Sequence, residues 1–107
     1  MQRLGVVTRL FEEILAGRKT STIRFREGPI VPGPMLYVCD GAPERRVVVE
    51  VTRVTAMPLS AVAATLGRER EWPPTVMLEG MREHYPGIGL ADEVCVIEHT
   101  APVAEGT

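Results

Sequence analysis

The sequence has few of the residues on which metal centres, disulfide frameworks and membrane spans depend. It contains two cysteines and two histidines in 107 residues, and they are not clustered as a zinc site requires. No apolar run approaches the ~20 residues of a membrane span. Arg3 and Arg9 interrupt the N-terminal apolar segment, which does not fit a signal peptide. We therefore expect no metal, no cofactor, no membrane partner and a cytoplasmic location, with Cys39 and Cys95 reduced and buried.

The size and charge of the chain are ordinary for one globular domain. Hydrophobic residues make up 45% and charged residues 24% of the sequence. The net charge of −2 argues against a surface that wraps long nucleic acid, although a local basic patch remains compatible with it. We expect a single domain over residues 1–99 and a loose C-terminal tail over residues 100–107.

The N-terminal half contains a clear helix-to-strand junction. Apolar residues at helical spacing predict a helix over residues 9–16, which ends before a glycine. The β-branched residues that follow predict a strand over 20–24. In a regular strand, Thr22 and Arg24 would face a cleft and Ile23 would anchor the opposite face in the core.

The remaining elements follow from alternation, turn residues and helical spacing. Asp40 and Gly41 form a turn signal between two strands of an expected antiparallel hairpin. We expect strands over 35–39, 47–55 and 93–99, and helices over 59–66 and 75–85. This order predicts an α+β domain with a curled sheet or small barrel and flanking helices.

The junction itself gathers reactive groups. By residue type it reads as a polar edge strand, where Lys and Thr are common protective residues. The alternative reading is a Thr hydroxyl next to the Lys19 amine, because a hydroxyl becomes a good nucleophile when a neighbour takes its proton. In a regular strand Lys19 lies on the face opposite Thr22, so the two side chains meet only if the backbone bends at the junction. A lysine takes a proton only if burial or nearby cations lower its pKa. Arg18 and Arg24 are such cations, and either guanidinium can also grip a phosphate or a carbonyl.

A second group of candidates precedes the third helix. Glu69 and Glu71 read as solvated charges or, alternatively, as a general acid that reaches the cleft. Trp72 reads as a packing residue or as a surface on which a planar base stacks. His84 and His99 lie on separate elements, and we interpret both as structural.

Residues 11–24 resemble the signature of the ASCH domains, a branch of the PUA-like superfamily. The resemblance extends to Tyr85-Pro86-Gly87 and to a final strand that ends in Val96-Ile97-Glu98. Within the superfamily the chain resembles in particular the small bacterial N4-acetylcytidine amidohydrolases. The resemblance implies a PUA-like small β-barrel with helices at its openings and a cleft for a nucleobase or nucleoside.

The resemblance also implies roles for individual residues. It makes Lys19 the proton acceptor and Thr22 the nucleophile. For the proton donor, counting back from the Tyr-Pro-Gly motif leads to Arg70, which lies between Glu69 and Glu71. We assign Glu71, because it adjoins Trp72 and the acid of the family lies near such a bulky apolar residue; Glu69 is the reserve. The residues expected to bind substrate are Arg18, Thr20, Arg24 and Trp72.

The implied activity is metal-independent hydrolysis of N4-acetylcytidine, or a related N-acylated nucleoside, to cytidine and acetate. The partner is then a small nucleoside, with RNA as a further possibility. Two alternatives stay open: a non-catalytic ASCH domain that binds RNA or a nucleotide, and an RNA-cleaving ASCH protein. The natural substrate and the oligomeric state are not fixed by the sequence.

Overall fold

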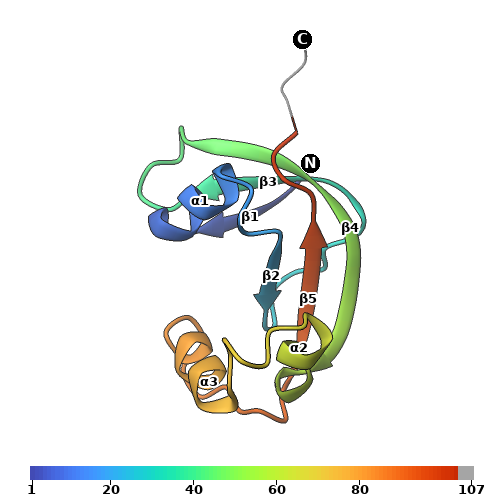
Figure 1. Cartoon of the computed structure of the whole chain (residues 1–107). Coiled ribbons are helices and arrows are strands. Elements are labelled where there is room, and N and C mark those ends of the chain that lie inside the picture. The colour runs from blue at the N-terminus through green and yellow to red at the C-terminus, as the bar shows by residue number, and fades with distance from the viewer. Residues whose placement is uncertain (104–107) are drawn as a thin grey trace. The chain divides into compact units, whose positions relative to one another are not determined.

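The computed structural model describes residues 1–103 and has the expected α+β composition. This part of the chain contains five strands and three helices (Figure 1). The elements are β1 (Gln2–Val6), α1 (Thr8–Leu15), β2 (Ser21–Arg24), β3 (Gly33–Cys39), β4 (Arg46–Pro58), α2 (Leu59–Thr65), α3 (Pro74–Arg82) and β5 (Glu93–His99). The hydrogen-bonded strand order is β1-β3-β4-β5-β2. β1 pairs with β3 in parallel, and β3 pairs with β4 in the predicted antiparallel hairpin.

The chain divides into two compact units, which we describe one at a time. The first unit comprises Met1–Thr22, Gly28–Val54 and the segment that begins at Ile97. The second unit comprises Ile23–Glu27 and Thr55–Val96. The single domain over 1–99 therefore stays a prediction.

The expected loose tail extends beyond the described residues, since residues 104–107 lie outside them. Its first residues are tied to β4 in the first unit. The backbone N–H of Thr100 donates to the Glu50 carbonyl, and that of Val103 donates to the Val48 carbonyl, both at 2.9 Å. These two bonds give residues 100–103 a fixed path along β4.

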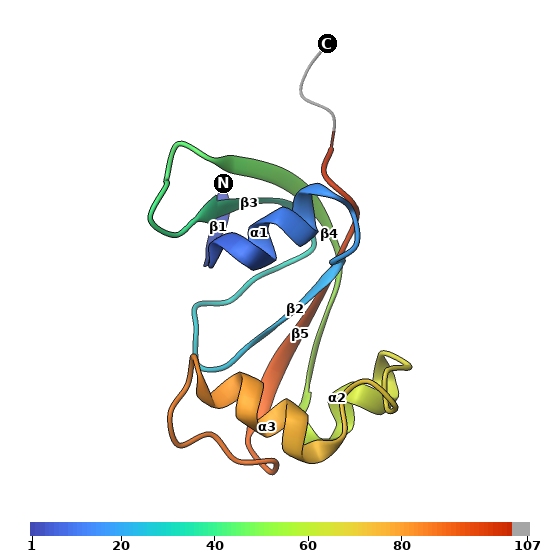
Figure 2. The ribbon, with the colours of Figure 1, turned by 60° about the vertical axis from the view of Figure 1, so that its left-hand side comes forward.

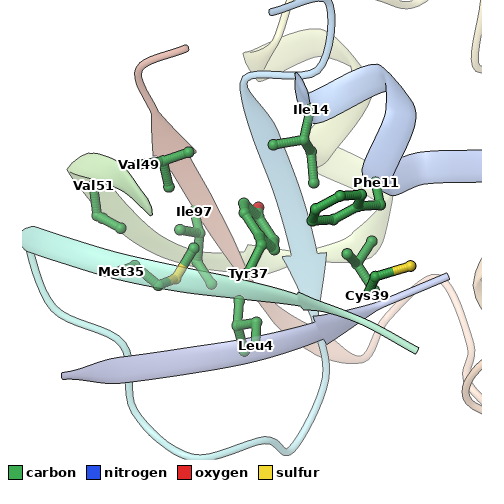
Figure 3. Packing of buried hydrophobic residues seen from close by; sticks show 10 residues of the cluster. Leu4, Phe11, Ile14, Met35, Tyr37, Cys39, Val49, Val51 and Ile97 are labelled. Carbon is green, nitrogen blue, oxygen red and sulfur yellow. The ribbon is translucent and has the colours of Figure 1, made fainter. Parts of the chain in front are cut away.

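The core of the first unit follows from strand alternation and one helical face. The parallel register places Leu4 opposite Tyr37, and both side chains are buried. Phe11 and Ile14, three residues apart on α1, cover this surface (Figure 3). Burying each of these large side chains contributes about 1.5–3 kcal/mol. The other buried members are Val6, Met35, Cys39, Val49, Val51 and Ile97.

The core of the second unit lies between α2, α3 and the first part of β5. α2 and α3 lie beside each other in both ribbon views (Figure 2). Neither helix has a side-chain N-cap, but the Leu90 and Asp92 carbonyls accept hydrogen bonds from the first N–H groups of α2. The buried side chains are Leu59, Val62, Met77, Met81, Ile88, Val94 and Val96.

Two sequence-based expectations are wrong. Cys39 is buried, but Cys95 is exposed, because Val94 and Val96 occupy the inward positions on either side of it in β5. The predicted helix over 75–85 begins earlier and ends earlier, as α3. Its first residue is Pro74, whose missing N–H costs nothing in a first helical turn.

Candidate functional site

The junction after α1 is a rigid turn that ends the helix and positions Lys19. Gly17 has φ of 77°, a left-handed conformation that glycine adopts without strain. Its N–H donates to the Ile14 carbonyl, and the N–H of Arg18 donates to the Glu13 carbonyl, both at 3.0 Å. These two bonds form a Schellman motif. The N–H of Lys19 bonds to the Glu13 carbonyl as well, at 3.1 Å, so the backbone of the predicted base is fixed by the helix end.

The predicted nucleophile is buried. Thr22 is 6% exposed, whereas Lys19 and Ile23 are half-buried and Thr20 is exposed. Ile23 contacts a core as predicted, but Thr22 is the more deeply buried of the two, and its outlook on a cleft stays a prediction. Thr22 belongs to the first unit, and Ile23 packs against the core of the second.

Sequence reasoning missed the chemical context of His99 in the first unit. This side chain is 5% exposed, and its Nε2 lies 2.8 Å from the Tyr37 hydroxyl. Its Nδ1 lies 2.7 Å from the Thr100 carbonyl, which can only accept. Nδ1 therefore carries the proton, and Nε2 accepts a hydrogen bond from the Tyr37 hydroxyl. The two residues are 62 positions apart in the chain, so no local signal reports the pair.

His99 also connects to the candidate residues. Its backbone N–H donates to the Thr20 carbonyl at 2.9 Å. Burial is the main cause that lowers the pKa of His99, and the positive charge of Lys19 lowers it further, while the hydrogen bond to Thr100 opposes both. The Lys19 charge therefore acts on an imidazole whose Nε2 accepts a hydrogen bond from the Tyr37 hydroxyl.

Arg18, a predicted substrate-binding residue, turns to the surface. Its Nε donates to the Glu13 carboxylate, and both side chains are well exposed. The hydrogen bond to Glu13 raises the pKa of Arg18 above its ordinary value. An exposed ion pair of this kind contributes little to stability.

Arg24 is engaged in a network of the second unit that the sequence did not predict. Its side chain is 15% exposed, and Nη1 lies 3.4 Å from the Glu27 carboxylate. The Tyr85 hydroxyl donates to the same carboxylate. Burial and this hydrogen bond raise the pKa of Tyr85 to about 12, so it remains a neutral donor. The Tyr85 ring also meets the Phe25 ring edge to face, with centroids 5.8 Å apart.

The predicted proton donors lie on the turn before α3, also in the second unit. Glu71 is exposed, and its carboxylate accepts a hydrogen bond from Arg68 at 3.0 Å. Glu69 is exposed and makes no ion pair with any residue that the structure describes. Trp72 is half-buried, with the Arg68 guanidinium 5.1 Å from its ring centroid.

The structure thus groups the candidates into two sets. Lys19, Thr22 and His99 belong to the first unit, and the candidate acids Glu69 and Glu71 belong to the second. A shared catalytic set of Lys19, Thr22 and Glu71 stays a prediction. Within residues 1–103, no group of three or more His, Cys, Asp or Glu side chains is placed to hold a metal ion. None of the described helices is long and apolar enough to cross a membrane.

Comparison with solved structures identifies the fold. The ASCH protein of Zymomonas mobilis matches with a TM-score of 0.66 at 12% identity, over 94% of this chain and 68% of that one. Its tyrosine-to-phenylalanine mutant matches with a TM-score of 0.69 at 11% identity, over 95% of this chain and 71% of the other. A protein from Enterococcus faecalis V583 matches with a TM-score of 0.51 at 15% identity, over 92% and 74% of the two chains.

These likenesses confirm the predicted fold class. The chain has the α+β fold of the ASCH structures, which is the PUA-like fold expected from the sequence. At this level of identity the likeness concerns the fold alone. The sequence matches no family model, and no curated protein matches it.

Proposed function

We propose that this ASCH-fold chain hydrolyses the N4-acetyl amide of acetylated cytidine, with Thr22 as nucleophile and Lys19 as base. The observation that carries the proposal is the junction after α1. There a half-buried amine and a buried threonine hydroxyl lie three residues apart on a backbone fixed by a Schellman turn. Little water reaches the Thr22 hydroxyl, so its proton must pass to a neighbouring group or to the ligand.

The chemistry proceeds in two steps. Neutral Lys19 accepts the proton of Thr22 as the oxygen attacks the acetyl carbonyl. The C–N bond to the cytosine N4 then breaks, and the carboxyl of Glu71 supplies the proton that the leaving amine needs. Water then attacks the acetyl-threonine ester and gives a proton to the Glu71 carboxylate, while Lys19 returns its proton to the threonine oxygen; acetate is released and all three groups are restored. The sequence assigns Arg24, Thr20 and Trp72 to substrate binding in this scheme.

The test is incubation of the purified chain with N4-acetylcytidine, with cytidine and acetate followed by chromatography. We expect product with the unmodified chain, a fall to background with Thr22→Ala, and partial activity with Thr22→Ser. The control is Thr75→Ala, which removes an exposed hydroxyl from α3 and should leave turnover unchanged. Unchanged turnover in Thr22→Ala would remove Thr22 as nucleophile.

The charges weigh against binding of an RNA backbone as the main activity. Arg18 pairs with Glu13 and Arg24 pairs with Glu27, so both guanidiniums of the junction already face a carboxylate. A phosphate would have to compete with these partners. If the chain instead binds RNA without turnover, its affinity will fall steeply with salt, whereas turnover of a neutral nucleoside will change little. No product at high enzyme concentration, together with that salt dependence, would overturn the hydrolase proposal.

A further inference from the structure

The second unit contains a pocket of about 230 Å³ between α2, the turn before α3, and α3 itself. All of its lining residues belong to this unit. Those that matter for its chemistry are Ser60, Ala63, Ala64, Glu69, Trp72 and Met77. Its volume is below the ~300–1,000 Å³ of most ligand pockets, which favours a small ring system over a drug-sized ligand.

The hollow arises from the sequence of α2. Ser60, Ala63 and Ala64 stand at helical spacing on one face, and their short side chains leave the space open. Leu59 and Val62 turn into the core and hold the helix there. Beside the pocket, the consecutive prolines that begin α3 restrict the backbone of its rim. The pocket is therefore built into the framework of the unit.

The lining combines an apolar surface, one aromatic wall and one carboxylate. Glu69 is the only charged residue among the described lining residues. It makes no ion pair with any residue that the structure describes. Trp72 supplies the aromatic wall. Arg68 contacts the Trp72 ring and pairs with Glu71, so the indole is held from outside the pocket lining.

An ionised carboxylate only accepts hydrogen bonds, so the matching ligand must present donors. Its two oxygens suit two neighbouring N–H groups on the edge of a flat ring. Among the nucleobases, guanine presents this edge through its N1–H and its 2-amino group. We propose that this pocket binds a guanine base, with the ring against Trp72 and the donor edge on Glu69.

This site uses neither Lys19 nor Thr22, the base and the nucleophile of the proposed hydrolysis. It gives a role in binding a second base to Trp72, which the sequence assigned to substrate binding, and to Glu69, which the sequence held in reserve as the acid. Cytosine is the wrong match for this edge, since its N4 amino donor adjoins the N3 acceptor, which the second carboxylate oxygen would repel. The pocket and the hydrolytic junction can therefore be tested separately.

Trp72 is the only tryptophan in the chain, so its fluorescence reports on the pocket directly. The full chain is titrated with guanosine, inosine and cytidine, with free tryptophan as the correction for ligand absorbance and calorimetry as a second measurement. We expect saturable quenching by guanosine. Inosine lacks the 2-amino group and should bind about tenfold more weakly, because one hydrogen bond to a charged acceptor is lost. Cytidine should bind more weakly still.

Matched variants separate the pocket from the rest of the surface. Glu69→Gln should weaken guanosine binding about tenfold, while Glu79→Gln, on the exposed side of α3, should leave it unchanged. Ala63→Leu should fill the pocket and abolish quenching, while Thr65→Leu, outside the pocket on the same helix, should not. Thermal melts show whether each variant is folded.

The proposal is overturned by any of three results: no saturable quenching, equal affinity for guanosine and cytidine, or unchanged affinity in a folded Ala63→Leu variant. None of these depends on turnover of N4-acetylcytidine. Conversely, guanosine binding that responds to Glu69→Gln stands even if the chain hydrolyses no acetylated nucleoside.

Discussion

Tyr37→Phe tests the buried hydrogen bond between Tyr37 and His99, the histidine on whose pKa the Lys19 charge acts. The substitution keeps the ring in the core and removes only the hydroxyl that donates to His99 Nε2 at 2.8 Å. Tyr37 is fully buried, so water does not readily replace the donor. A buried acceptor left without its partner costs about 1–3 kcal/mol. We therefore expect the free energy of unfolding to fall by about 2 kcal/mol at neutral pH.

The cost should depend on pH in a defined direction. Burial, reinforced by the charge of Lys19, holds the pKa of His99 below its ordinary value. In the unfolded chain His99 titrates near the ordinary value of ~6.5. The stability gained from a neutral His99 is therefore fully present above that pH and is lost as the pH falls through the lowered folded pKa. Because the Tyr37 hydroxyl stabilises the neutral ring, the difference between the two proteins should shrink as the pH falls.

Urea denaturation followed by circular dichroism measures the effect. With a typical slope of 1–3 kcal/mol per molar urea, a loss of about 2 kcal/mol lowers the midpoint by roughly 1 M. Tyr85→Phe is the matched control, since the exposed Glu27 that loses its donor keeps Arg24 as a partner and should tolerate the change better. A midpoint for Tyr37→Phe equal to that of the unmodified chain, or a cost that grows on acidification, would refute the assigned tautomer and its donor.

Two further substitutions test the junction itself. Gly17→Ala forces a side chain into a left-handed conformation and should cost about 1–2 kcal/mol in urea denaturation; Gly28→Ala, where the added methyl meets open space, should cost far less. Lys19→Met should raise the pKa of His99 in an NMR titration, but not to its ordinary value, because burial is the larger cause. An unmoved His99 titration would show that the Lys19 charge does not act on this ring.

Elements with a local signal were predictable from the sequence. Helical spacing in α1 and alternation in the β3–β4 hairpin and β5 locate these elements, and β5 has the predicted bounds. The parallel pairing of β1 with β3 carries no such signal, because it joins residues about thirty positions apart. The exposure of Cys95 shows the same limit, since residue type predicts burial but the strand face decides it.

The candidate site divides in the same way. The family signature points to Lys19 and Thr22 as candidate base and nucleophile, because both lie within one short stretch of sequence. The partners that shape their surroundings are distant in sequence: Tyr37 reaches His99 across 62 positions. Tyr85 reaches Glu27, the partner of Arg24, across 58 positions. Periodicity and composition report neither contact, since each joins segments that are distant in the sequence.

These distant partners change the argument for Lys19 as a base. The sequence predicts that the cations Arg18 and Arg24 favour the neutral form of Lys19. The structure pairs each guanidinium with a glutamate, which offsets its charge. His99, whose pKa is lowered first by burial and also by the Lys19 charge, is held in the neutral form. A bound ligand that covers the half-buried Lys19 would exclude water from its amine and so favour the neutral form that a base needs.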